Sequence, residues 1–151
     1  MVKWALALLG ALSLAGWTVW SPPQAPRVWK TDLRIRSLDL MSVGQGSMQA
    51  TIGVSVEGDD AARAARLEIL LPVSVGVIRL PQGCRSSPAA VANLTARVTC
   101  DLGDIPGRGI REISVLTSSP PSRAGARYAA MVLSDTPDVT PSNNFAEREV
   151  P

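Results

Sequence analysis

The sequence predicts an all-β protein, a two-layer antiparallel β-sandwich preceded by a hydrophobic helix at the N-terminus. Three observations predict it. Apolar and polar residues alternate over many short segments, clusters of turn-forming residues separate these segments, and no segment beyond residue 30 shows the apolar stripe of an amphipathic helix. Many short strands without intervening helices are typical of two sheets that bury one face each against the other.

The clearest strand covers residues 47–57, where five apolar residues take alternate positions and so predict one buried face: Met48, Ala50, Ile52, Val54 and Val56. Shorter stretches predict strands at residues 31–40, 65–72, 74–80, 94–100, 111–117, 126–134 and 145–150. The alanine-rich residues 59–69 also allow a short helical turn, which yields to the strand by Leu67. The glycine-rich residues 103–109 predict a hairpin turn.

The first 20 residues predict a signal peptide or a membrane anchor. An uncharged, mostly apolar run covers residues 4–20. In one interpretation it is cleaved after the small residues Ser13-Leu14-Ala15, and in the other it stays in the membrane with Trp17 and Trp20 at the interface. Residues 21–30 form a proline-containing linker and residues 31–151 the β-sandwich domain. We therefore expect an exported protein, periplasmic or at the cell surface, either membrane-anchored or secreted.

The composition argues against most catalytic and nucleic-acid-binding functions. Fifteen basic and 13 acidic residues give a net charge of +2 and no broad basic field, so nucleic acid is not an expected partner. There is no histidine, which removes the commonest general base and transition-metal ligand. We therefore expect that the protein is not an enzyme and binds no cofactor. We also do not expect a carbohydrate ligand, since only Trp29, Tyr128 and Phe145 are aromatic beyond residue 20.

The two cysteines, Cys84 and Cys100, predict a structural disulfide. An even count in an exported chain favours a bond, and closing a loop of this length contributes about 3 kcal/mol to stability. The alternative is two unpaired buried thiols. A zinc site would need two further ligands that the sequence does not supply, and the spacing differs from the Cys-x-x-Cys of redox-active pairs.

Three segments together resemble a known family: "LLPVSV", "VTCDLGDIPGRGIREISVLTSS" and "GARYAAMVLSDTPDVTPSNNFAEREV". In this order, over residues 31–150, they are similar to the bacterial extracytoplasmic Ig-like repeat family known as domain of unknown function eleven. The resemblance implies an immunoglobulin-like sandwich outside the cytoplasm and no catalytic residues. Two features depart from the family pattern: Glu57–Asp60 replaces its usual Asn-x-Gly, and the chain holds one copy of a domain that commonly occurs in tandem. The matching features are Leu71-Pro72, Cys100–Gly103, Pro106-Gly107 and Asp138 with Asn143-Asn144.

The stretch "DTPDVTPSNN", residues 135–144, predicts a structural corner between the last two strands. Prolines fix φ there, and aspartate and asparagine side chains bond neighbouring backbone groups. The alternative is a calcium site that uses Asp135, Asp138, Asn143 and Asn144, because calcium prefers oxygen ligands. A glycosylation sequon, which arises often by chance, begins at Asn93.

These observations lead to two functional hypotheses. The first is a non-catalytic extracytoplasmic Ig-like module with a structural or protein-interaction role in a bacterial cell envelope. Its partners would be another envelope protein, bound through main-chain hydrogen bonds at a strand edge, and the membrane through residues 4–20 if these are uncleaved. The second is a calcium-dependent adhesive or sensing domain that uses the Asp135–Asn144 corner.

Overall fold

The computed structural model describes residues 28, 30–44, 46–88 and 94–151. The predicted N-terminal helix, Trp17, Trp20 and the sequon at Asn93 lie outside these residues. In the described ranges, no helix has the length and apolar character needed to cross a membrane.

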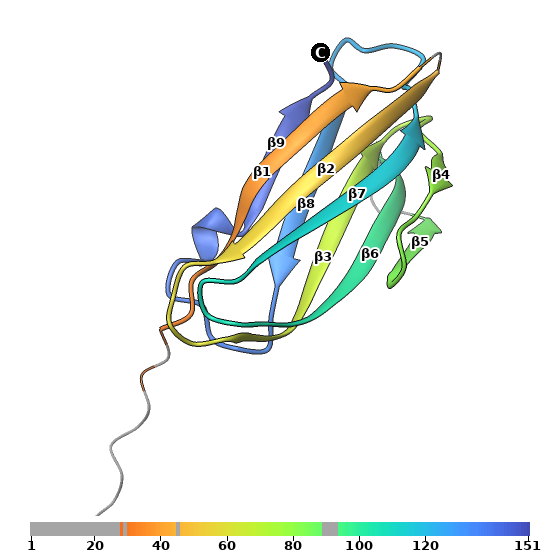
Figure 1. Cartoon of the computed structure of the whole chain (residues 1–151). Helices are drawn as coiled ribbons and strands as arrows, with labels where there is room; N and C mark the ends of the chain where they lie inside the picture. The colour runs from red at the N-terminus through yellow and green to blue at the C-terminus, as the bar shows by residue number, and fades with distance from the viewer. Residues whose placement is uncertain (1–27, 29, 45, 89–93) are drawn as a thin grey trace, which may run out of the picture.

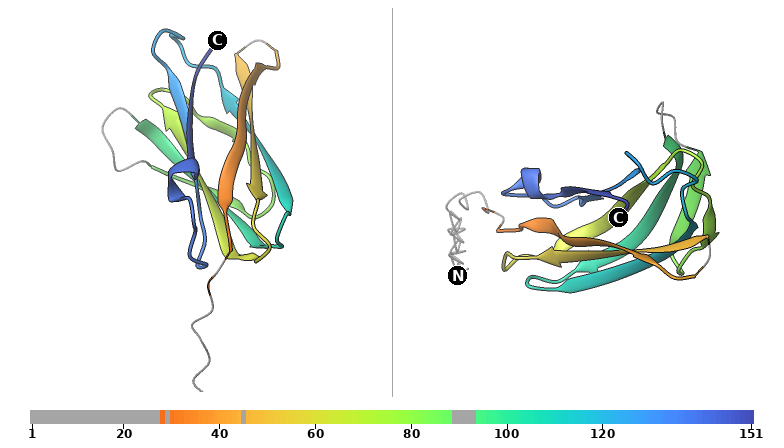
Figure 2. Two further views of the ribbon diagram at one scale, coloured as in Figure 1. Left: turned by 90° about the vertical axis from the view of Figure 1, so that its left-hand side faces the viewer. Right: turned by 90° about the horizontal axis from the view of Figure 1, so that it is seen from above.

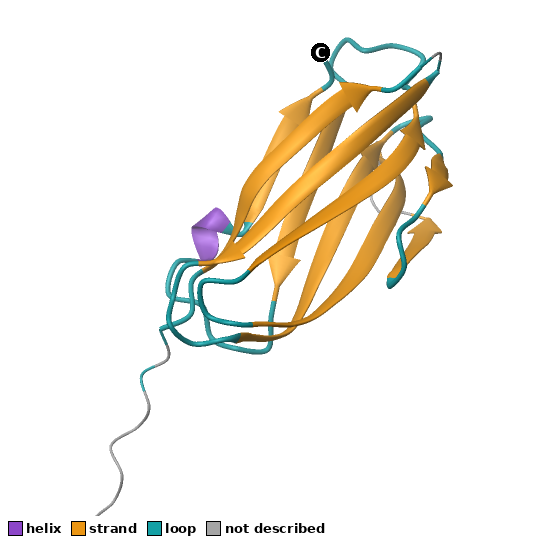
Figure 3. Cartoon of the chain, in the orientation of Figure 1, coloured by secondary structure: helices purple, strands orange, loops and turns teal. Residues whose placement is uncertain are grey.

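Across the described ranges, nine strands build the molecule (Figures 1 and 3). The only helical segment among these residues is a short 3-10 turn, η1 (Pro141–Asn143). The strands form two sheets, whose orders are β1-β2-β7-β4 and β5-β6-β3-β8-β9, with every pairing antiparallel. The bounds are β1 (Leu33–Ser42), β2 (Ser47–Val56), β3 (Ala62–Pro72), β4 (Val77–Arg79), β5 (Cys84–Pro88), β6 (Leu94–Ile105), β7 (Ile110–Ser118), β8 (Arg127–Leu133) and β9 (Phe145–Glu149).

The two sheets lie face to face, as the view from above in Figure 2 shows. The chain crosses from one sheet to the other between β2 and β3, between β3 and β4, between β4 and β5, between β6 and β7, and between β7 and β8. The groups β1-β2-β7 and β3-β8-β9 repeat the strand orders ABE and CFG of immunoglobulin constant-type sandwiches. The predicted all-β, two-layer antiparallel fold is therefore confirmed, and this strand order is the reason to describe it as Ig-like.

Three local expectations were wrong or incomplete. Strand β5 was not predicted, because its five residues are mostly exposed and carry no apolar alternation. The helical turn near residues 59–69 does not form: β3 begins at Ala62 and passes through an irregularity with Ala64 at φ 48°. Residues 106–109 do turn the chain, but they connect strands of different sheets, so they do not form a hairpin.

The core lies between the sheets and comes from alternate positions of the strands, as the periodicity predicts. All five apolar residues of the predicted 47–57 strand are at most 1% exposed. Opposite them, Leu67, Ile69 and Leu71 of β3 are fully buried. A hydrocarbon side chain buried in this way stabilises the folded state by roughly 1.5–3 kcal/mol. The sandwich is thus a rigid scaffold on which turns and outer faces can carry function.

One polar network crosses this core. The hydroxyl of Tyr128 lies 2.7 Å from the hydroxyl of Thr117, and Thr117 donates to the carbonyl of Met48 at 3.2 Å. Because Thr117 has a single proton to donate, the Tyr128 hydroxyl is the donor to Thr117. A buried tyrosine at the start of β8 that bonds an upstream residue resembles the tyrosine corner of immunoglobulin-like sandwiches.

This network makes stability depend on alkaline pH. Burial raises the pKa of Tyr128 above its ordinary value of 10.0. The unfolded chain therefore loses this proton first, so the stability contributed by Tyr128 is complete below pH 10 and is lost as pH rises above it. We expect Tyr128→Phe to remove this alkaline pH dependence of stability and to lower the free energy of unfolding by about 1 kcal/mol at neutral pH.

Tyr128 is the only tyrosine of the chain, so tyrosinate absorbance reports on this residue alone. Titration of folded and urea-unfolded protein gives its two pKa values, and urea melts across the same pH range give the stability. A folded-state pKa equal to that of the unfolded chain would contradict the prediction. Thr117→Val is the matched variant, since it keeps the tyrosine but leaves its hydroxyl without this acceptor.

Candidate functional site

The predicted corner at residues 135–144 fastens the start of β1 to the other sheet. Asp138 accepts hydrogen bonds at its carboxylate from the backbone N–H of Leu33 at 3.0 Å and of Thr140 at 2.7 Å. The side chain of Asn144 also donates to it, at 3.1 Å. Next to these contacts, Thr31 and Asp138 form a parallel bridge, in which the N–H of Val139 donates to the Thr31 carbonyl at 3.0 Å. The corner is therefore a structural clamp, as its turn chemistry predicts.

The remaining residues of the corner have separate roles. The side chain of Asn143 donates to Asp32 at 2.9 Å. Thr136 accepts from the backbone N–H of Arg63 at 3.0 Å and donates to the carbonyl of Ala61 at 3.2 Å, so it holds the beginning of β3. Sequence reasoning missed Thr136, because its partners lie more than 70 residues away in the chain.

At this corner, the carboxylates of the predicted calcium site already have partners, whereas its two asparagine oxygens have none within the part of the chain that the structure describes. Asp135 forms a long ion pair with Arg66, 3.9 Å between charged atoms, and Asp138 already accepts three N–H groups. The side-chain oxygens of Asn143 and Asn144 are buried without a hydrogen-bond partner among the described residues. Within those residues, no group of three or more acidic or cysteine side chains could hold a metal ion.

We expect calcium to leave the melting temperature unchanged, because the Asp138 carboxylate would have to give up N–H donors to bind it. Thermal melts with added calcium, and then with a chelator in excess, check this. A rise of several degrees with calcium that the chelator reverses would support the cation-binding hypothesis instead. Magnesium at the same concentration controls for ionic strength.

Two turns pack tightly against each other, and one of them against the chain at Lys30, at the same pole of the sandwich as the clamp. The guanidinium of Arg108 pairs with Asp59 at 2.8 Å, and the backbone N–H of Arg108 donates to the Gly58 carbonyl at 3.1 Å. A side chain at Gly58 would overlap the Lys30 carbonyl, and one at Gly107 would overlap the Asp59 carbonyl. This close backbone approach explains why both turns have glycine at these positions. Gly107 belongs to Pro106-Gly107, one of the features that match the family pattern.

The predicted Cys84–Cys100 disulfide is present. The two residues are direct partners in the antiparallel pairing of β5 with β6. Cys100 is fully buried on the core side of β6, whereas Cys84 is half-buried on the outermost strand of the five-stranded sheet. The bond therefore attaches an edge strand to the core.

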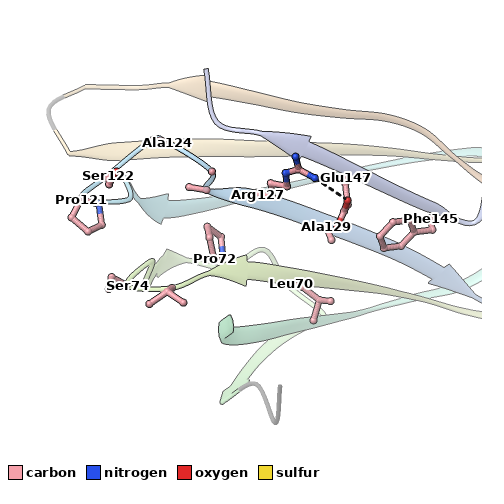
Figure 4. Close-up of a pocket in the computed structure, with 13 residues that line it drawn as sticks. Leu70, Pro72, Ser74, Pro121, Ser122, Ala124, Arg127, Ala129, Phe145 and Glu147 are labelled. Atoms are coloured by element: carbon pink, nitrogen blue, oxygen red, sulfur yellow. Dashed lines mark ion pairs between the residues drawn. The ribbon is translucent and has the colours of Figure 1, made fainter. Parts of the chain in front are cut away.

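A groove that the sequence did not predict lies on the outer face of the five-stranded sheet (Figure 4). Its volume is about 490 Å³. Leu70 of β3 and Ala129 of β8 are direct partners on neighbouring strands, and they line the groove together with Phe145 of β9. The turn after β3 and the loop before β8 line its far part, through Pro72, Val73, Ser74, Pro121, Ser122, Ala124, Gly125 and Ala126.

The lining is mainly apolar, with one charged side. Phe145, the only phenylalanine of the chain, is 49% exposed, and Val73 is 54% exposed. Arg127 lies between two acids of β9: its guanidinium is 3.8 Å from the Glu147 carboxylate and 3.9 Å from that of Glu149. These ion pairs are solvent-exposed and contribute little to stability. The groove is apolar, and the exposed ion pairs beside it can open to contact a ligand. Such a surface suits an extended, partly apolar ligand better than a small polar one.

Sequence reasoning overlooked the groove because its residues occupy the outward positions of three strands that are distant in sequence. Periodicity marked Tyr128, Ala130 and Val132 as the inward row of β8, and burial confirms this. The same alternation assigns Ala129 to the outer face, although only the sheet order explains why Leu70 and Phe145 line the same groove there. The exposed Phe145 at the start of the final strand was the available signal.

Comparisons with known proteins give likeness of fold only. No protein-family model matches the sequence, and no curated protein matches it significantly. Among solved structures, the chain is similar to a CBM3 of Hungateiclostridium clariflavum, with 11% identity over 81% of this chain and 99% of that one and a TM-score of 0.46. It is also similar to an uncharacterized immunoglobulin-like protein from Nocardia farcinica, with 15% identity over 78% and 97% and a TM-score of 0.44.

A GH20 exo-β-N-acetylglucosaminidase from Vibrio harveyi matches with 14% identity and a TM-score of 0.40. That match covers 78% of this chain and spans only 17% of the glucosaminidase. At such low identity no residue role passes from these proteins to this chain. The described residues thus form a two-layer antiparallel β-sandwich with one disulfide, a corner clamp and an outer groove.

Proposed function

We propose that this chain is a non-catalytic, exported Ig-like module of a bacterial cell envelope, and that its outer groove binds a segment of another envelope protein. The observation that carries the proposal is the exposed Phe145 beside the apolar surface of Leu70 and Ala129. Aromatic side chains next to a preformed apolar depression are typical anchors of protein interfaces.

The polar groups of the groove support binding better than catalysis. The ionisable residues that line it are Arg127 and Glu147, which neutralise each other. Ser74 and Ser122 also line it, but the chain has no histidine to activate a serine hydroxyl. Nothing in this lining pairs a nucleophile with a base, as hydrolytic chemistry requires.

The disulfide supports the proposed location. Such bonds form and persist in oxidising spaces such as the bacterial periplasm and the cell surface. The apolar run at residues 4–20 fits the same location, either as a cleaved leader or as an anchor. Intact-mass measurement of the protein from the native membrane fraction would distinguish these two forms and would detect the oxidised cysteines.

The groove is tested by binding with one matched pair of variants. Phe145→Asp places a charge in the groove, whereas Met41→Asp places one at the end of β1, on the other sheet, at a residue 58% exposed. Partners captured by the wild-type chain from detergent-solubilised envelope are identified, purified and titrated against all three proteins. We expect Phe145→Asp to weaken binding at least tenfold, as for an anchoring aromatic, and Met41→Asp to bind normally. Equal weakening by both variants, or by neither, would refute the groove as the binding surface.

A further inference from the structure

We propose that β5 and its disulfide cover a self-complementary edge of β6, and that reduction of the disulfide lets two copies of this chain pair through that edge. The inference concerns a surface different from the outer groove. It rests on how β5 is attached, on which β6 groups it covers and on the charges of β6.

Strand β5 is held to the sheet almost entirely through β6. It is an edge strand, so it pairs on one side only. Four of its five residues are exposed, and Cys84 is the one that is half-buried. A strand that buries so little apolar surface and pairs on one side has little stability of its own. The Cys84–Cys100 bond is therefore the main attachment of β5 to the core.

Strand β5 covers the hydrogen-bonding groups of alternate β6 residues. The N–H of Asp101 donates to the Gly83 carbonyl at 3.0 Å, and Cys84 is opposite Cys100. In an antiparallel pair the residues that exchange hydrogen bonds alternate with those that do not. The backbone groups of Arg97, Thr99 and Asp101 therefore point towards β5, and its departure would leave them unpaired.

The edge uncovered in this way is complementary to a second copy of itself. In a two-fold symmetric antiparallel pair centred on Thr99, Arg97 of each copy lies opposite Asp101 of the other. The pairing thus brings together two pairs of opposite charges on the outer face of the sheet, each favourable in a cross-strand position. A centre on Arg97 or on Asp101 would instead place like charges opposite each other. The charge pattern therefore selects one register and a second copy as the occupant.

The chemical step is an ordinary thiol–disulfide exchange. A dithiol reductant transfers two electrons and two protons to the Cys84–Cys100 bond, which leaves two cysteine thiols, and the reductant becomes a cyclic disulfide. Strand β5 then separates from β6, and the hydrogen-bonding groups of the β6 edge become available to the second copy. In the reverse step an oxidising disulfide accepts two electrons and two protons from the Cys84 and Cys100 thiols of one chain, which restores their bond and β5 and separates the dimer.

Hydrogen exchange tests the first half of the proposal. The full chain is compared with and without a dithiol reductant, and amide exchange is resolved by residue. We expect the amides of Arg97, Thr99 and Asp101 to lose protection at low protein concentration after reduction, whereas those of Val98 and Cys100, which face β3, keep it. Unchanged protection at Arg97, Thr99 and Asp101 would overturn the proposal.

Charge reversal tests the second half, in the thiol-free background Cys84→Ala/Cys100→Ala. We expect this background to form a concentration-dependent dimer in analytical ultracentrifugation without any reductant. Arg97→Glu or Asp101→Arg, added singly, places like charges opposite each other and should weaken the dimer at least about tenfold. An equal mixture of the two reversed variants should restore dimers, because each charge then meets its opposite.

A thiol-free chain that stays monomeric at high concentration would refute the pairing. Failure of the mixed variants to associate would refute the register. An unfolded thiol-free chain, detected by loss of the buried Tyr128 environment, would show that β5 is essential to the fold, and this result would also overturn the proposal.

Discussion

Removal of the Cys84–Cys100 disulfide is expected to lower the free energy of unfolding by about 3 kcal/mol. The two cysteines are 16 residues apart, and an open loop of this length gains conformational freedom mainly in the unfolded chain. A loss of this size is a large share of the 5–15 kcal/mol that stabilises an ordinary domain. The melting temperature should fall by about 10 °C, whereas the domain stays folded.

The double variant Cys84→Ala/Cys100→Ala provides the measurement, by urea unfolding at a protein concentration low enough to prevent association through β6. Wild-type protein in a dithiol reductant is the matched control and should lose nearly the same stability. The reductant should have no effect on the double variant. A loss below about 1 kcal/mol would mean that the bond does not restrict the unfolded chain in the way the loop length implies.

Asp138→Ala is expected to have the second large effect, a decrease of about 2–4 kcal/mol in the free energy of unfolding. Its carboxylate accepts the N–H of Leu33, a fully buried residue, and the side chain of Asn144. Hydrogen bonds to a charged group contribute about 1.5–3 kcal/mol each, and a buried N–H left without a partner is costly. Urea unfolding should show the full loss, and hydrogen exchange should show faster opening at the beginning of β1.

Two variants of the same corner make this prediction specific. Asp135→Ala removes a carboxylate that is 69% exposed and 3.9 Å from Arg66, so its effect should stay within about 0.5 kcal/mol. Asp138→Asn keeps one oxygen acceptor but turns an amide towards N–H donors, so it should fall between the wild type and Asp138→Ala. Equal losses for Asp135→Ala and Asp138→Ala would contradict the clamp, since only Asp138 contacts β1.

Local patterns were sufficient to predict the strands that form the core. The alternation in β2 correctly identified Met48 and Val54 as buried, because one face of that strand is buried along most of its length. The pairing of Cys84 with Cys100 followed from cysteine count and expected export. The corner chemistry correctly indicated a turn at Asp138, whose side chain bonds the backbone of Thr140 two residues on.

Features that depend on sheet order could not be predicted in the same way. Strand β5 has no periodic signal, because its register is set by β6 and the disulfide. The bond from Asp138 to Leu33 joins residues 105 positions apart, and the placement of Leu70 and Phe145 in one groove requires β3, β8 and β9 to be neighbours. Such long-range contacts are properties of the topology, and periodicity within one strand carries no information about them.

The clamp at Asp138 also has a mechanical consequence. The described chain enters at one pole of the sandwich, next to Thr31, and its C-terminus lies at the opposite pole (Figure 1). Tension between these ends runs along the strands, across hydrogen bonds that lie perpendicular to them. The chain segments at Thr31 and Asp138 run parallel to each other. Such a load therefore shears the hydrogen bonds between these segments, and several of the bonds must rupture together. A domain pulled from its two poles therefore resists extension first at the point where β1 begins.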